Sequence, residues 1–142
     1  MPQVFTHKTL RLSLRYDWLA APKIAPYLGP MRRYATIIEL KAAQVDEYRR
    51  LHAAVWPGVL KQLQQANVRN YSIFHYHLPD GRHCLFGYYE YHGLHHVSDM
   101  NLIAADAETK RWWALCSPMQ RPLDNRGDGE WWAAMDEVFH CD

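Results

Sequence analysis

The stretch Val68–Tyr91, VRNYSIFHYHLPDGRHCLFGYYEY, decides the fold that this sequence predicts. Its two ends, Val68–Leu78 and Cys84–Tyr91, are rich in β-branched and aromatic residues, which favour strands. The segment Pro79–Arg82, PDGR, has the residue types that form tight turns. We therefore expect a β-hairpin in the middle of the chain.

Upstream of this hairpin the pattern predicts a strand and then a helical region. Tyr34–Leu40, YATIIEL, is β-branched and apolar, as a buried strand would be. Val45–Ala66 has apolar residues at helical spacing, and Pro57 either ends the first helix or begins a second one.

Downstream the same alternation repeats. Leu94–Cys116 is predicted to be helical, and Asp106 is placed to cap its later half, Ala107–Cys116. Asp136–His140, DEVFH, is predicted as a last short strand. The order βαββαβ predicts an α+β fold of the ferredoxin-like type.

Aromatic residues occupy both faces of the predicted hairpin. Along the first strand Tyr71 and His75 point to one side, whereas Phe74 and Tyr76 point to the other. An antiparallel sheet with helices on one face normally has polar residues on the other. We therefore expect a second subunit to cover the open face in a two-fold symmetric homodimer.

Composition limits the classes of partner. The 142 residues suffice for one domain, and the formal net charge of +1 gives no field that would attract nucleic acid or an anionic membrane. Six tryptophans are typical of a small-molecule site and equally of a small core. Three cysteines without close spacing argue against a disulfide framework and favour a reducing compartment, hence the cytoplasm. The sequence also has no apolar run of about 18 residues that would span a membrane.

Residues 1–30 differ from the rest of the chain. They contain four basic residues against a single acidic one, and prolines occur at positions 22, 26 and 30. We expect a poorly ordered N-terminal extension over residues 1–30, followed by one domain over residues 31–142. The alternation of leucine with polar residues at positions 10–15 leaves a short added edge strand open.

A candidate site lies in the first helical region. Tyr48, His52 and Trp56 are spaced at i, i+4 and i+8, so one continuous helix would align them in an aromatic stripe with one titratable ring. Such residues at helical spacing are more often core residues with satisfied polar tips than ligands. The residues alone leave both interpretations open.

Five segments carry a family resemblance, and they occur in one order: Tyr48–His52 (YRRLH) continuing to Val55–Pro57 (VWP), Asn70–Ile73 (NYSI), Leu85–Tyr88 (LFGY), Arg111–Trp113 (RWW) and Glu137–His140 (EVFH). In these segments the chain from Met31 onward resembles the L-rhamnose mutarotase family. The resemblance implies a dimeric α/β barrel of ferredoxin-like subunits, with a sugar pocket between sheet and helices. It implies neither a metal nor an organic cofactor.

The resemblance also implies roles for individual residues. By position, the family's acid/base histidine is His52, its sugar-contacting tyrosines are Tyr48 and Tyr71, and its paired tryptophans are Trp112 and Trp113. Bacterial members often carry Asn-Pro directly after the histidine, where this chain has alanines at 53 and 54. They also carry a carboxylate after the Trp-Pro pair, where this chain has glycine at 58. These departures leave the preferred sugar open.

Mutarotation requires one proton acceptor and one proton donor. An acceptor takes the proton of the anomeric hydroxyl while a donor protonates the ring oxygen, and the open aldehyde turns before the ring closes. Histidine, with an ordinary pKa of about 6.5, exchanges protons near neutral pH. The second proton-transfer group stays open among Tyr71, Asp46 and a water molecule.

The predicted hairpin also contains a group of histidines. The histidines at 75, 77 and 83 suggest a metal site, but hairpin histidines are mostly solvated, so we expect no metal. We expect His95 and His96 on the surface. Two other function classes remain: a cofactor-independent monooxygenase or dehydratase on the same dimeric plan, and a non-catalytic sugar-binding module.

Overall fold

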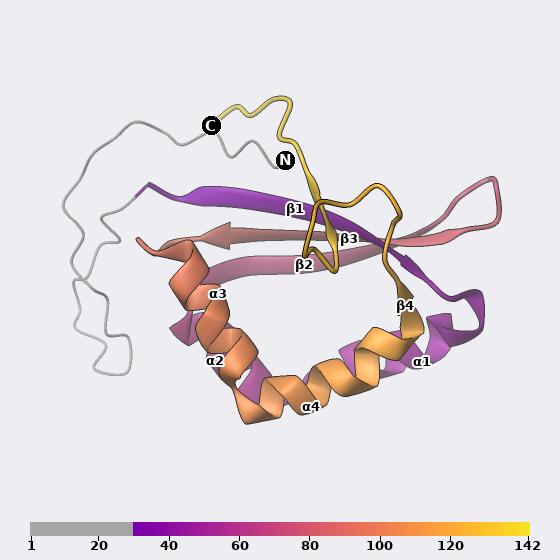
Figure 1. Cartoon of the computed structure of the whole chain (residues 1–142), viewed down its shortest axis with the longest axis horizontal. Helices are drawn as coiled ribbons and strands as arrows, with labels where there is room; N and C mark the ends of the chain where they lie inside the picture. Colours follow the sequence, from indigo (N-terminus) through magenta and orange to yellow (C-terminus); the bar gives the residue numbers. More distant parts are fainter. Residues whose placement is uncertain (1–29) are drawn as a thin grey trace.

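Five strands form one antiparallel sheet and four α-helices cover one of its faces in the computed structural model, which describes residues 30–142 (Figure 1). The strands are β1 (Arg32–Leu40), β2 (Val68–His77), β3 (His83–Tyr91), β4 (Gln120–Arg121) and β5 (Ala133–Met135). The helices are α1 (Val45–His52), α2 (Pro57–Gln65), α3 (His96–Ala105) and α4 (Ala107–Cys116). The expected N-terminal extension and its edge strand fall almost entirely outside the described residues.

The sheet has the strand order β2-β3-β1-β4, and β5 pairs with the middle of β1. The predicted hairpin is confirmed: His77 lies opposite His83, and Gly81 turns the chain with a φ of +90°, which glycine adopts without strain. The main core, which includes Ile38, Leu40 and Leu85, lies between the sheet and the helices.

The helix boundaries follow signals in the sequence. Pro57 is the first residue of α2, where its missing N–H costs no hydrogen bond. The side chain of Asp106 accepts a 2.8 Å hydrogen bond from the backbone N–H of Thr109, so the predicted cap of α4 is confirmed. None of the helices in residues 30–142 is long and apolar enough to cross a membrane.

Two sequence-based predictions about element boundaries are wrong. Helix α1 ends at His52, and Trp56 has extended geometry before Pro57, so Tyr48, His52 and Trp56 do not share one helix. A residue before proline disfavours α geometry, which explains the break. The last strand is Ala133–Met135 instead of Asp136–His140, because pairing with β1 at residues 35–37 overrides the weak strand preference of alanine and methionine.

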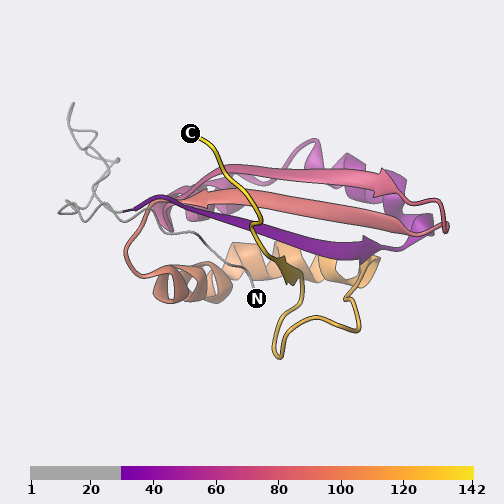
Figure 2. The same ribbon diagram turned by 90° about the horizontal axis from the view of Figure 1, so that it is seen from above.

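No helix lies on the other face of the sheet in the described part of the chain (Figures 1 and 2). The segment after β5 crosses this open face toward the C-terminus (Figure 2). It is attached there by Arg33 of β1, whose guanidinium makes a bidentate ion pair with Glu137. In the single chain this face is therefore crossed only by the segment after β5 and is covered by no helix of the described residues.

Candidate active site

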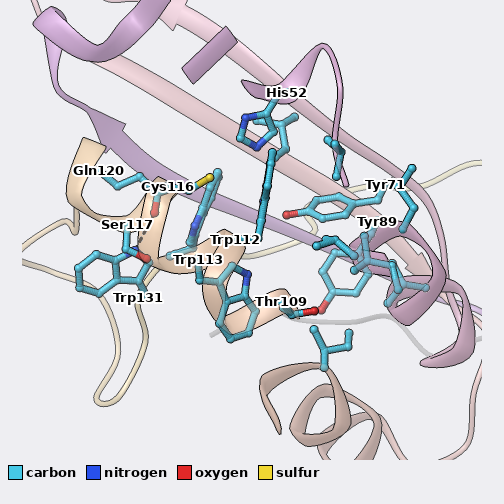
Figure 3. Close-up of a pocket in the computed structure, with 18 of the residues that line it drawn as sticks. His52, Tyr71, Tyr89, Thr109, Trp112, Trp113, Cys116, Ser117, Gln120 and Trp131 are labelled. Carbon is cyan, nitrogen blue, oxygen red and sulfur yellow. Dashed lines mark hydrogen bonds between the residues drawn. The ribbon is translucent and has the colours of Figure 1, made fainter. Parts of the chain in front are cut away.

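A cavity of about 600 Å³ lies between the helix-covered face of the sheet and the helices (Figure 3). Its lining comes from all four α-helices, from β2 and β3, and from the segment that follows α4. All five residues that the resemblance implied line it: Tyr48, His52, Tyr71, Trp112 and Trp113. The fold therefore brings together residues that are spread over 66 positions of sequence.

His52 lies in the last turn of α1, and its ring contacts two aromatic neighbours. The ring stacks on Tyr48 with centroids 4.0 Å apart and meets Trp112 edge-on at 5.2 Å. Its Nδ1 is 2.9 Å from the backbone oxygen of Tyr48, and a carbonyl only accepts, so Nδ1 carries the hydrogen. The other nitrogen, Nε2, is then left with a lone pair. Burial lowers the pKa of His52, which keeps the ring neutral at neutral pH.

Tyr48 and Tyr71 supply hydroxyl groups to the same cavity. Tyr48 is only 4% exposed, and burial, reinforced by the nearby Tyr71 hydroxyl, raises its pKa well above the ordinary value. Tyr71 is 45% exposed as a residue, and its hydroxyl points into the cavity (Figure 3). Burial around that hydroxyl raises the pKa of Tyr71 to about 12. Both phenols therefore remain hydrogen-bond donors at neutral pH.

A β-bulge aims Tyr71 at the cavity. Between Arg69 and Ser72 strand β2 has one residue more than its partner β3, and Asn70 there has a left-handed φ of 48°. The extra residue reverses the alternation of side chains, so Val68 and Tyr71 both face the helices although they are three residues apart. The Asn70 side chain fixes the bulge by donating a 2.7 Å hydrogen bond to Glu90.

The paired tryptophans have different surroundings. Trp112 is buried and contacts His52 and Trp56 edge-on, the latter at 5.4 Å. Trp113 is exposed on one side and reaches the cavity from the neighbouring position on α4 (Figure 3). The indole edges and the aliphatic side chains make the lining largely apolar.

Several cavity residues escaped the sequence-based prediction. Tyr89 shares a 2.9 Å hydrogen bond with Nε2 of His96, whose ring stacks on Tyr34 at 4.1 Å, so the expectation that His96 is a surface residue is wrong. The Cys116 thiol lies at the cavity wall, where burial raises its pKa to about 11. Gln120 also lines the cavity, and no sequence signal marked it, because a one-turn 3-10 helix and a two-residue strand place it there.

Two tryptophans near the C-terminus belong to the cavity wall. Trp131 and Trp132 both line the cavity, and the indole N–H of Trp131 donates a 2.7 Å hydrogen bond to Oε1 of Gln120. Asp46 is exposed in the first turn of α1 and is absent from the lining. Of the two residues expected as second proton-transfer groups, Tyr71 therefore lines the cavity and Asp46 does not.

The hairpin histidines form a stack outside the cavity. Arg49 donates a 2.9 Å hydrogen bond to Nδ1 of His75, and Nε2 of His75 is 2.9 Å from Nδ1 of His83. The rings of His77 and His83 are parallel with centroids 4.1 Å apart. Within residues 30–142 no three histidine, cysteine or acidic side chains are grouped as ligands of a metal ion.

The family model of L-rhamnose mutarotase matches residues 33–141 of this sequence. The chain belongs to the L-rhamnose mutarotase family. This is a family of carbohydrate isomerases that interconvert anomers, so the family expected from the sequence is confirmed.

Individual relatives agree with this assignment. The chain is 30% identical over 115 residues to L-rhamnose mutarotase of Oceanobacillus iheyensis, covering 79% of this chain and all of the relative. It is 32% identical over 115 residues to L-rhamnose mutarotase of Listeria monocytogenes, covering 78% and 98%. A crystal structure of an L-rhamnose mutarotase from Formosa agariphila superposes with a TM-score of 0.59 at 22% identity, covering 78% of this chain and 98% of that one. That likeness shows the mixed α/β fold.

One departure from the mutarotase family pattern has a structural counterpart. The resemblance implied a carboxylate directly after the Trp-Pro pair, where this chain has Gly58. A Cβ at Gly58 would overlap the carboxylate of Glu108, which extends from the first turn of α4. A carboxylate is therefore present beside the start of α2, but it comes from a different helix.

Proposed function

We propose that this chain interconverts the α and β anomers of L-rhamnose, or of a closely related 6-deoxyhexose, by acid/base ring opening and closing at His52. Family membership supports the reaction class. The observation that carries the mechanism is the hydrogen bond from Nδ1 of His52 to the Tyr48 carbonyl, because it leaves the lone pair on Nε2.

The proton steps balance with the groups in the cavity. Nε2 of His52 takes the proton of the anomeric hydroxyl, the bond between C1 and the ring oxygen breaks, and a phenol or a water molecule protonates that oxygen. After the aldehyde turns about the C1–C2 bond, the C5 hydroxyl adds to its other face. His52 then returns its proton to the new anomeric oxygen, and the donor regains its own. A positioned acid or base typically contributes about 10²–10⁴-fold.

We assign sugar binding to Tyr48, Tyr71, Trp112 and Trp113. Phenolic hydroxyls are suited to the sugar's hydroxyl groups, and an indole packs against its C–H face and 6-methyl group. The apolar lining around Trp112 supports this assignment. The mechanism uses neither a metal nor an organic cofactor.

Anomer exchange by NMR tests the proposed function. Saturation of one anomeric proton of L-rhamnose should transfer to the other anomer much faster with the protein than without it. His52→Ala should abolish the acceleration, whereas His77→Ala, which removes an exposed imidazole outside the cavity, should retain it. Line broadening without exchange would indicate a sugar-binding module, and no effect across L-rhamnose, L-fucose and related sugars would favour the oxygenase type.

We also propose the finer features of the assembly. The strand order β2-β3-β1-β4 with helical segments between the strands supports a ferredoxin-like subunit. Phe74 and Tyr76 are 62% and 60% exposed on the open face of the sheet, which supports a homodimer packed sheet to sheet as a dimeric α/β barrel. All three cysteines, which lie within the described residues, are free thiols, which supports a cytoplasmic location.

A further inference from the structure

Gln120 connects Trp131 to the Tyr48 hydroxyl at one end of the cavity. It is the first residue of β4, where it lies opposite Leu40 of β1, and its side chain is 7% exposed. Its Oε1 accepts a 2.7 Å hydrogen bond from the indole Nε1 of Trp131 (Figure 3), and its Nε2 donates one of 3.3 Å to the Tyr48 hydroxyl oxygen. Both polar ends of a buried amide are thus satisfied by cavity residues.

The indole fixes the direction of this chain of hydrogen bonds. An indole N–H is only a donor, so the amide must turn its oxygen toward Trp131 and therefore its nitrogen toward Tyr48. The Tyr48 oxygen then accepts from Gln120, and its own hydrogen is left for another acceptor. With the amide reversed, its oxygen would face the phenol and would take that hydrogen instead.

We propose that Gln120, oriented by Trp131, is a positioning residue that turns the Tyr48 O–H toward the sugar, so that Tyr48 is the donor paired with His52 in ring opening. This proposal rests on the proposed function, and it names as the second proton-transfer group Tyr48, which was not among the groups that the sequence suggested.

The geometry beside His52 carries this assignment. The Tyr48 ring stacks on the His52 ring with centroids 4.0 Å apart, and both residues line the cavity, so the phenol and the imidazole serve the same part of the site. Because burial raises the pKa of Tyr48, the phenol keeps its proton until the ring oxygen develops charge. The orientation set by Gln120 matters because the Tyr48 O–H could otherwise rotate about its C–O bond toward other acceptors.

Two substitutions of nearly equal size separate orientation from packing. Gln120→Glu keeps an acceptor for Trp131 but replaces the amide donor by a carboxylate oxygen, which accepts a hydrogen bond from the Tyr48 O–H and turns it away from the sugar. Gln120→Met fills the same space and leaves the phenol free to rotate. At pH 7.5 we expect the first change to lower kcat for anomer exchange by about tenfold or more with little change in KM, and the second to lower it less.

The pH profile provides a readout that a structural role would not move. As the pH falls, the introduced carboxyl takes up a proton and becomes a donor again. The deficit of Gln120→Glu relative to wild type at the same pH should therefore shrink between pH 8 and pH 5, whereas that of Gln120→Met should stay constant. Trp131→Phe frees the amide to reverse and should lower kcat by an intermediate factor. Gln65→Glu, an exposed position on α2, is the matched control and should leave exchange unchanged.

A Tyr48→Phe background isolates the relay. There Gln120→Glu should cause no further loss of activity, because the hydroxyl group that the carboxylate would bind is absent. Equal effects of Gln120→Glu and Gln120→Met at every pH, or the same loss from Gln120→Glu with and without the Tyr48 hydroxyl, would overturn the proposal while leaving the mutarotase function intact. A wild-type protein that does not accelerate exchange would overturn the proposed function and this inference with it.

Discussion

Nδ1 of His52 donates a 2.9 Å hydrogen bond to the backbone carbonyl of Tyr48, one turn earlier on α1. This contact fixes both the tautomer and the orientation of the imidazole, because the carbonyl accepts a hydrogen and never supplies one. A buried ring held in this way is a base that does not need to reorganise before it accepts a proton.

The first prediction concerns pH. Only neutral His52 accepts a proton, and burial lowers its pKa below 6.5, so kcat/KM for anomer exchange should fall toward acid pH with a midpoint below 6.5 and level off at higher pH. Saturation-transfer rates between pH 4.5 and pH 8 measure this, with an NMR titration of His52 for comparison. A midpoint above 6.5 would contradict the assignment of His52 as the base.

The second prediction concerns the Tyr71 hydroxyl. Tyr71→Phe should keep the ring contact with Tyr89, whose centroid lies 5.7 Å away, and lose one hydrogen bond to the sugar. Sugar affinity should fall by up to about tenfold, which is the usual effect of one neutral hydrogen bond. Calorimetric titration with L-rhamnose measures this. Tyr76→Phe, on the open face, is the control and should bind as the wild type does.

The third prediction concerns the bulge that aims Tyr71. Asn70 has a φ of 48°, which β-branched residues strongly disfavour. Asn70→Val should lower the free energy of unfolding by about 1–2 kcal/mol and weaken sugar binding. Asn70→Gly, which accepts this φ but loses the bond to Glu90, should cost less. Urea unfolding compares the free energies of unfolding of the two variants. Equal losses would show that the left-handed backbone conformation is not the cause of the destabilisation.

The fourth prediction concerns Gly58 and Glu108. A Cβ at Gly58 would displace the Glu108 carboxylate, the flexible end of its side chain, and Gly58→Glu would then hold two carboxylates side by side, so the free energy of unfolding should fall by about 0.5 kcal/mol through their repulsion. Adding Glu108→Ala should recover most of this loss, since it vacates the space. A double-mutant cycle by urea unfolding measures the coupling, and additive effects would refute it.

The fifth prediction concerns assembly. Phe74→Lys places a charge on the exposed aromatic patch of the open sheet face and should convert the proposed homodimer to a monomer. Light scattering after gel filtration measures the mass directly. Leu102→Lys, at an exposed position on α3, is the control and should remain dimeric. A wild-type mass of 16.7 kDa, that of one chain, over the whole concentration range would refute the dimer.

Much of the fold was predictable because its signals are local. The turn at Gly81, the helix start at Pro57 and the cap at Asp106 each depend on a few neighbouring residues, and the structure confirms all three. The prediction misplaced the last strand because its pairing with β1 is a long-range interaction, and the local sequence of three residues does not indicate it.

The sequence by itself determined the family and named five of the residues that line one cavity, since the segments that carry the resemblance contain them. Only the tertiary structure decided what joins them. The bulge at Asn70, the Glu108 carboxylate beside Gly58, and the Trp131–Gln120–Tyr48 hydrogen bonds depend on segments far apart along the chain. Contacts between these segments fix the direction of the hydrogen bonds and the orientation of the side chains, and no local sequence pattern predicts such contacts.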